Sequence, residues 1–400
     1  MTSNRNRWSA LALSALASSL LVAWYLNQRT VRAHVEVLDN RQAVEELLAE
    51  RPARPKPVAP LEIHERVRRF PWRETLVTRI YPQVDLDGFE LHEVLGFRRR
   101  GGLDQEALFA EYPGGRYRIQ TNSLGLRDRE LPEERDLLVL FAGDSQTEGV
   151  CENDESFVNR LEQGLARRYP GRAIEALNAA LGGTGPWYYR DTLEAYLELE
   201  PDLFVAVFYG GNDLSGVILL ERFYRRRGGG RSLDSFREQN AAGLASLPGA
   251  TRTSVINQAI YFEVNPEDIE FALSAWCSIA LEMRDRCQEA GVRFRPVFLP
   301  SPFVGQPGIF QAAREEVALA LPDIVDELEL EDRLADRWIQ VLREEGVEPI
   351  DLRPAFQEED RCLYWQADRH LNLLGQEVVA RALEGVLGAE VEQRLLSPIR

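Results

Sequence analysis

From Leu137 onward, the chain alternates between short apolar runs and longer segments in which apolar residues recur at helical spacing. The short runs are rich in residues that favour β-strands, and they cover 137–141, 174–177, 203–208 and 294–299, with a weaker fifth run at 348–352. The segments with helical spacing are 154–169, 187–199, 266–291, 323–346 and 373–388. Strands that are apolar along their whole length are typical of a parallel sheet covered by helices on both faces. The pattern therefore predicts an α/β domain with three layers, α/β/α, over 134–400.

The segment before this domain, residues 61–133, has no helical periodicity. It contains short pieces in which apolar and polar residues alternate, such as Arg116-Tyr-Arg-Ile-Gln120. A period of two is the pattern of a β-strand that is buried on one face. We therefore expect 61–133 to be a β-rich lead-in segment that packs on the α/β domain.

The longest apolar run lies near the amino terminus, from Trp8 to Leu26. A helix needs about 20 mainly apolar residues to cross a bilayer, and this run just reaches that length. We therefore predict an N-terminal transmembrane helix in residues 1–30, followed at 31–60 by a polar stalk and a proline-rich linker. A cleaved signal peptide is the alternative, because Ala15-Leu-Ala17 resembles a cleavage site, but the apolar run continues past it. A buried core helix is disfavoured because a polar stalk follows.

Charge does not fix the side of the membrane, because arginines also follow the apolar run, at positions 29, 32 and 41. A short N-terminal tail followed by an anchor is the usual arrangement of an exported protein. We therefore expect the α/β domain to be extracytoplasmic, either periplasmic or on the cell surface. The 28% of charged residues argues against a protein with many membrane spans.

The chain is acidic, with 47 basic and 64 acidic side chains and a formal net charge of −17 at pH 7. A charge of this sign repels phosphate backbones, so nucleic acid is not an expected partner. The composition leaves the oligomeric state undetermined.

The four cysteines form no Cys-x-x-Cys pair, so the sequence predicts neither a metal site nor a redox site. Cys277 and Cys287 lie on one predicted helix, about 15 Å apart, which is too far for a disulfide. Cys151 and Cys362 could approach each other and form a bridge. Free, buried thiols are the favoured interpretation.

A candidate nucleophile, Ser145, follows the first predicted strand within Gly143-Asp-Ser-Gln-Thr-Glu-Gly149. A serine at the carboxyl end of a strand lies where open α/β sheets place their ligands. The N-terminus of the next helix offers free N–H groups to a developing oxyanion. The motif differs from the Gly-x-Ser-x-Gly elbow, because Thr147 occupies the second glycine position. Taken alone, it could be an ordinary turn.

Two further strand ends carry groups that can donate hydrogen bonds. The second strand ends in the glycine-rich Asn178-Ala-Ala-Leu-Gly-Gly-Thr-Gly185, where a backbone N–H could face the site. The third ends in Tyr209-Gly-Gly-Asn-Asp213, where Asn212 offers a side-chain amide. Each could equally be an ordinary strand-to-helix turn. The aromatic group 187–189 that follows the glycines could stack on a sugar, but a place in the core is favoured.

The candidate base is found by elimination, because His370 is the only one of four histidines that lies within 134–400. It follows the last predicted strand and precedes the last predicted helix. Asp368 lies two residues earlier, so its carboxylate could hold the imidazole tautomer that a base requires. A lone loop histidine is usually a surface residue, but four such motifs at strand ends favour a catalytic site.

Together these motifs resemble the SGNH (GDSL-like) hydrolase superfamily over about residues 118–390, including Thr121-Asn-Ser-Leu-Gly-Leu-Arg127, a stretch that often precedes this domain in bacterial members. The resemblance implies a flavodoxin-like parallel sheet and Ser145 as nucleophile. It also implies an oxyanion hole formed by the N–H groups of Ser145 and Gly183 and by the Asn212 side chain. The closing block of the family usually reads Asp-x-x-His and is one residue shorter here. Polysaccharide acetyl-transfer branches use a similar Asp-x-His, so Asp368 is the expected acid, with Asp360 a distant substitute.

The function that this resemblance implies is a serine esterase that removes acyl groups, preferably acetyl, from a carbohydrate or related ester without a metal or cofactor. An O-acetyltransferase of a cell-envelope or exported polysaccharide shares the same chemistry, as does a lipid esterase. A non-catalytic envelope binding module is the alternative of a different class. The arginine-rich tract 225–231, in a long insertion after the Asn212 block, could be a lid, although a solvated loop is favoured.

Overall fold

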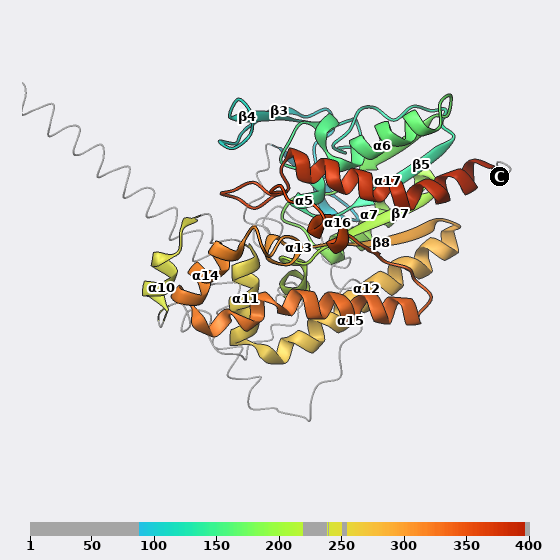
Figure 1. The fold of residues 1–400 in the computed structure, drawn as a ribbon. Helices are drawn as coiled ribbons and strands as arrows, with labels where there is room; N and C mark the ends of the chain where they lie inside the picture. Colours follow the sequence, from blue (N-terminus) through green and yellow to red (C-terminus); the bar gives the residue numbers. More distant parts are fainter. Residues whose placement is uncertain (1–87, 219–237, 239, 250–253, 397–400) are drawn as a thin grey trace, which may run out of the picture.

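The centre of the molecule is a five-stranded parallel sheet (Figure 1). The computed structural model describes residues 88–218, 238, 240–249 and 254–396. The strands of the sheet, in chain order, are β5 (Leu137–Ala142), β6 (Ile174–Asn178), β7 (Leu203–Tyr209), β8 (Arg293–Leu299) and β9 (Ile350–Asp351). Their order in space is β6-β5-β7-β8-β9, with every neighbouring pair parallel. This is the flavodoxin-like order that the family resemblance implied.

Helices cover both faces of the sheet, and each face has its own apolar core. In β5, Leu138 and Leu140 face one core, while Val139 and Phe141 face the other. The first core lies under α7 (Pro186–Ala195), α12 (Ile269–Ala290) and α15 (Leu330–Glu344). The second lies under α6 (Phe157–Arg168) and α17 (Leu373–Leu396), which run together along one face (Figure 1). Because both faces are buried, the prediction of three layers is confirmed.

The strand predictions hold closely, except at the edge of the sheet. The segment predicted as 348–352 contributes only two residues to β9. Pro349 precedes them and has no N–H to donate to a neighbouring strand, which restricts proline to sheet edges and strand starts. The aromatic group 187–189 is buried at the start of α7, so the prediction that it belongs to the core is confirmed.

Several helices differ from the sequence prediction. The predicted segment 323–346 is helical only from Leu330, because 3-10 turns occupy Pro322–Ile324 and Asp326–Leu328. Short helices were not predicted, and they are α10 (Ala241–Ser246), α11 (Ser254–Val264), α13 (Pro302–Gly305), α14 (Gln311–Ala320) and α16 (Arg353–Gln357). In α11, eight of eleven residues are buried, so its sequence lacks the polar face that marks an amphipathic helix.

In its described part, residues 88–133, the lead-in segment contains two small antiparallel hairpins, and neither belongs to the central sheet. β1 (Phe89–His92) pairs with β2 (Gly96–Arg99), and β3 (Asp104–Leu108) pairs with β4 (Arg116–Gln120). Phe97 and Leu126 are buried in the core under α7, where the Tyr188 hydroxyl donates to the Phe97 carbonyl at 3.2 Å. The lead-in segment is therefore packed on the α/β domain.

Several predicted segments lie outside the described residues. They are the anchor at 1–30, the stalk and linker at 31–60, the start of the lead-in segment up to residue 87, and the arginine-rich tract 225–231. Among the helices that the structure describes, none has the length and apolar character needed to cross a membrane. All four cysteines are free thiols, so no bridge joins Cys151 to Cys362.

Candidate active site

Ser145 lies at the first position of α5 (Ser145–Glu148), three residues after the end of strand β5. Asp144 caps this short helix, because its Oδ1 accepts the Gln146 N–H at 2.9 Å. Gly143 makes the tight turn possible, since a Cβ there would lie 2.2 Å from the Thr147 Oγ1. The backbone therefore presents the serine at the carboxyl edge of the sheet, where the sequence placed it.

The imidazole of His370 bridges Ser145 and Asp368. Its Nε2 lies 2.7 Å from the Ser145 Oγ, and its Nδ1 lies 2.9 Å from the Asp368 Oδ2. The Asp368 Oδ1 also accepts the backbone N–H of His370 at 2.9 Å. The spacing of two residues works because Arg369 between them has a left-handed backbone, with φ of +67°. Asp368, rather than Asp360, is therefore the carboxylate that bonds this imidazole.

The charges around the imidazole favour its protonated form. Burial lowers the pKa of His370, but the hydrogen bond and charge of Asp368, with smaller contributions from Asp144 and Glu148, raise it above 6.5 overall. Burial raises the pKa of Asp368, but its hydrogen bond to His370 lowers it below 3.8 overall. The side chain of His370 is 25% exposed, so a substrate can reach it from solvent.

The loop that carries His370 is hydrogen-bonded to the residue next to the serine. The Gln146 Oε1 accepts the Leu371 N–H at 2.9 Å, and its Nε2 donates to the Arg369 carbonyl at 3.3 Å. Gln376 of α17 donates to the Gln146 carbonyl at 3.4 Å and accepts the Phe157 N–H at 2.8 Å. These contacts fix the distance between base and nucleophile. This role of Gln146 was not predicted from the sequence, although its position directly after Ser145 was a usable signal.

The glycine-rich loop after β6 passes directly beside Ser145. The Leu181 N–H donates to the Gly143 carbonyl at 3.1 Å, and the Gly182 N–H donates to the Glu148 Oε2 at 2.8 Å. A Cβ on Gly182 would lie 2.8 Å from the Glu148 Oε2 and 3.3 Å from the Ser145 Cβ, so a side chain there would displace its neighbours. Gly183 follows with φ of +78°, a conformation that favours glycine.

Asn212 follows β7, and its side chain lies near enough to Asp144, the residue before the serine, to influence the pKa of that carboxyl. Burial raises the pKa of Asp144 to about 6, while hydrogen bonds from the Gln146 N–H and the Asn212 side chain, together with the charge of His370, oppose this rise. Asp213 stabilises the turn after β7, because its carboxylate accepts the Tyr209 N–H at 2.8 Å and the Tyr189 hydroxyl at 2.9 Å. The turn after β7 therefore lies beside the turn after β5 that carries Ser145.

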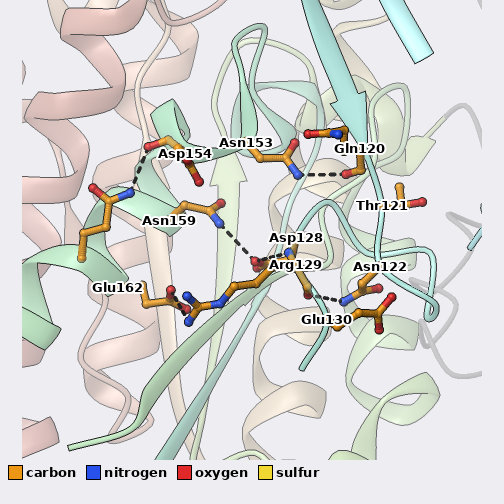
Figure 2. A pocket seen from close by; sticks show the side chains of 11 residues that line it. Gln120, Thr121, Asn122, Asp128, Arg129, Glu130, Asn153, Asp154, Asn159 and Glu162 are labelled. Atoms are coloured by element: carbon orange, nitrogen blue, oxygen red, sulfur yellow. Dashed lines mark hydrogen bonds and ion pairs between the residues drawn. The ribbon is translucent and has the colours of Figure 1, made fainter. Parts of the chain in front are cut away.

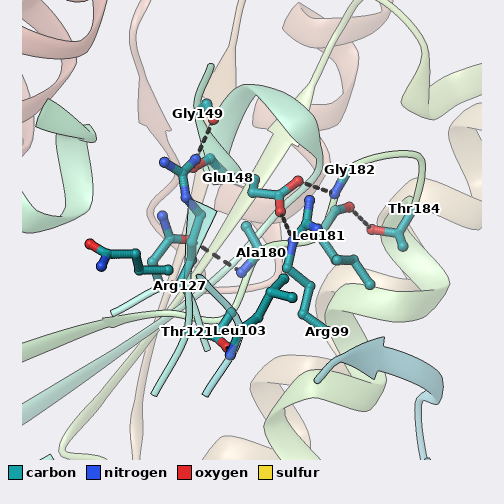
Figure 3. Close-up of polar contacts among 12 residues, drawn as sticks. Arg99, Leu103, Thr121, Arg127, Glu148, Gly149, Ala180, Leu181, Gly182 and Thr184 are labelled. Atoms are coloured by element: carbon teal, nitrogen blue, oxygen red, sulfur yellow. Dashed lines mark hydrogen bonds and ion pairs between the residues drawn. The ribbon is translucent and has the colours of Figure 1, made fainter. Parts of the chain in front are cut away.

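A buried ion pair ties the lead-in segment to this site (Figure 3). The guanidinium of Arg99, at the end of β2, bonds the carboxylate of Glu148, and their side chains are only 13% and 8% exposed. Arg127 donates to the backbone carbonyls of Glu148, Gly149 and Cys151. Arg127 and Glu148 both lie within motifs of the sequence, but their contacts and the role of Arg99 were not predicted, because nothing in the sequence joins Arg99 to Glu148, 49 residues away.

A separate polar cavity of about 350 Å³ lies between the lead-in segment and α6 (Figure 2). Burial raises the pKa of Asp128 to about 6 and that of Glu162 to about 7. Asp128 accepts the Asn159 amide at 3.1 Å, and Glu162 accepts the Ala176 N–H at 2.8 Å. The lining does not include Ser145 or His370. Within the described ranges, no group of three or more His, Cys, Asp or Glu side chains is arranged to hold a metal ion.

Comparison with known proteins identifies one family. The model of the GDSL-like lipase/acylhydrolase family matches residues 141–378, which include Ser145, Asn212 and His370. A search of curated proteins finds no match.

Solved structures that resemble the chain share little sequence with it. LAE5, an α/β hydrolase enzyme from the metagenome of Lake Arreo in Spain, is 16% identical with a TM-score of 0.38, covering 63% of this chain and 95% of its own. A catalytic mutant of Axe2, an acetylxylan esterase from Geobacillus stearothermophilus, is 16% identical with a TM-score of 0.37, covering 63% and 94%. A two-domain esterase active on acetylated mannans is 12% identical with a TM-score of 0.36, covering 64% and 50%.

Proposed function

Because this chain belongs to the GDSL-like lipase/acylhydrolase family, we propose that it is a serine esterase that removes acyl groups, preferably acetyl, from a carbohydrate or a related ester. The observation that carries this proposal is the contact of 2.7 Å between the Ser145 Oγ and the His370 Nε2, with Asp368 on the far side of the ring. A hydroxyl paired with an imidazole that a carboxylate orients is the arrangement of an activated serine nucleophile.

In the proposed reaction, His370 takes the proton of the Ser145 hydroxyl while the Ser145 oxygen attacks the ester carbonyl. The bond from the carbonyl carbon to the alcohol oxygen then breaks, and His370 returns the proton to the leaving alcohol. Water is next deprotonated by His370 and attacks the acyl-enzyme, which releases the carboxylic acid and restores the hydroxyl of Ser145. Asp368 holds the imidazole and stabilises its charged form throughout.

The negative charge that develops on the carbonyl oxygen needs donors, and three are proposed here. They are the N–H groups of Ser145 and Gly183 and the side-chain amide of Asn212. Support comes from the glycine loop, which is hydrogen-bonded to the Ser145 turn, and from Asn212, whose side chain meets Asp144. One such donor typically contributes roughly 3 kcal/mol to the stability of the transition state.

The test is acetate release from acetylated xylan and acetylated mannan by the full chain, with Ser145→Ala as the matched control. We expect the wild-type protein to release acetate and Ser145→Ala to release none above background. On p-nitrophenyl esters, the rate should fall as the acyl chain lengthens, whereas a lipid esterase would show the reverse. Adding an unacetylated glycan distinguishes the transferase, which would acetylate the glycan instead of releasing acetate. A Ser145→Ala protein with wild-type esterase activity would refute the proposal.

A further inference from the structure

We propose that Glu111, in the turn between β3 and β4 of the lead-in segment, is a positioning residue that holds the His370 loop in its reactive geometry. This inference rests on the proposed esterase function, since it assigns Glu111 a role in the same site. It extends the catalytic machinery to a part of the chain that precedes the family match at residues 141–378.

One carboxylate binds three successive backbone amides of the loop. The Glu111 Oε1 accepts the Gln366 N–H at 2.6 Å. Its Oε2 accepts the Ala367 N–H at 2.8 Å and the Asp368 N–H at 3.3 Å. Successive N–H groups that converge on one anion form a concave binding site for negative charge. The last of these amides belongs to the carboxylate residue that orients His370.

The turn that carries Glu111 is held from two sides. Against the loop, Phe109 and Tyr112 pack edge-on to Trp365, with ring centroids 5.6 Å and 6.4 Å apart. Away from the loop, the Tyr112 hydroxyl donates to the Glu155 carboxylate at 2.7 Å, which ties the turn to the segment after Ser145. These contacts fix the backbone of the turn from which the Glu111 side chain extends.

The stretch 366–368 is held mainly by these contacts, because the bonds from Gln146 reach the loop only at Arg369 and Leu371. Gln366, Ala367 and Asp368 are all exposed, so apolar burial does not fix this stretch. Two further backbone bonds, from the Trp365 N–H to the His370 carbonyl at 2.7 Å and from the Arg369 N–H to the Trp365 carbonyl at 3.2 Å, join residues within the loop. Segments with few buried contacts open locally at low free-energy cost. The Glu111 contacts therefore restrain the position of Asp368 relative to the rest of the molecule.

The expected consequence of losing these contacts is a displaced Asp368 carboxylate and a less ordered imidazole. A misplacement of about 1 Å in a catalytic group can lower the rate by about 100-fold. The groups whose charge acts on His370 are Asp368 on its own loop and Asp144 and Glu148 at the serine turn. Because Asp368 raises the pKa of His370, weakening that pair should lower this pKa.

The experiment compares Glu111→Gln and Glu111→Ala with the matched control Glu106→Gln, all in the full chain with p-nitrophenyl acetate. The control removes a carboxylate on the same hairpin that binds Arg116 at 3.1 Å instead of the loop. We expect kcat to fall at least about 10-fold in both Glu111 variants with little change in KM. The acid limb of the kcat/KM profile should also move to lower pH, because the pKa of His370 falls. Glu106→Gln should match the wild type.

Wild-type kcat and an unmoved acid limb in a folded Glu111→Gln would overturn the inference. A loss of activity with an unmoved limb would do so as well, since partial unfolding lowers activity at every pH alike. Glu111→Asp keeps the charge on a shorter side chain and should restore part of kcat. If Ser145→Ala stays active, the esterase proposal itself fails, whereas an inactive Ser145→Ala beside a normal Glu111→Gln refutes only the role of Glu111.

Discussion

Replacing Arg99 with methionine should destabilise the protein strongly, because it leaves the buried carboxylate of Glu148 without its ion-pair partner. Removing one partner of a buried pair typically costs about 3–5 kcal/mol. The lower end applies here, since Glu148 keeps the Gly182 N–H at 2.8 Å and the charge of nearby Arg127. Methionine retains apolar contact with Phe89, whose ring lies 5.0 Å from the guanidinium carbon. The expected loss in free energy of unfolding is therefore about 3 kcal/mol.

The dependence of this loss on pH follows from the pKa of Glu148. Burial raises this pKa, but the charge and hydrogen bond of Arg99 lower it below 4.5 overall in the wild type. The ion pair therefore contributes stability above the unfolded pKa of Glu148, and that contribution is lost as pH falls through the folded value. In Arg99→Met, burial is less opposed and the pKa of Glu148 rises. The deficit relative to wild type should thus be largest at neutral pH and shrink toward acid pH, where Glu148 takes up a proton.

The assay is urea unfolding of both proteins near neutral pH and at about pH 5, with Arg98→Met as the control. Arg98 pairs with Glu90, but their side chains are 24% and 39% exposed, so its loss should cost at most about 1 kcal/mol. The double variant Arg99→Met with Glu148→Gln should recover part of the loss, because no unpaired charge remains buried. A deficit below about 1 kcal/mol, a deficit that grows at acid pH, or a double variant as unstable as the sum of its parts would refute this reasoning.

Two further predictions concern catalysis. Asn212→Ala should lower kcat for p-nitrophenyl acetate about 100-fold with little change in KM, and an unchanged kcat would remove Asn212 from the oxyanion hole. Because the base must be neutral and its pKa is raised, kcat/KM should fall as pH drops through a value above 6.5. In Asp368→Asn this limb should move to lower pH, since the carboxylate that raises the pKa of His370 is gone; a limb that stays in place would contradict the pairing.

The parts of the protein that could be predicted are those that produce a recognisable local pattern in the sequence, such as an apolar run or a motif. The buried strands around Leu137 and Leu203 are continuous apolar runs, and the chain order of the strands together with the family motifs implied the sheet. Ser145 and His370 could be paired because one histidine alone lay in the α/β domain. The pairing of Asp368 with His370 required a left-handed residue at Arg369, which nothing in its identity indicates. Local periodicity also could not predict α11, which is buried on most sides.

The contacts that the sequence did not predict join residues far apart in the chain. Glu111 bonds amides 255 to 257 residues away, and Arg99 bonds Glu148 across 49 residues. Neither Glu111 nor Arg99 lies in a recognisable motif, so nothing in the sequence distinguishes them from charged residues on the surface. Their partners become visible only when the hairpins of the lead-in segment are placed on the domain.

The central claim is that His370 activates Ser145 as a nucleophile, and labelling with a fluorophosphonate probe tests it most directly. The account predicts one adduct on the full chain, mapped by peptide mass spectrometry to the Ser145 oxygen, absent in Ser145→Ala and formed far more slowly in His370→Ala. A wild-type protein that takes up no probe, an adduct at another residue, or labelling of Ser145 at an unchanged rate without His370 would contradict it.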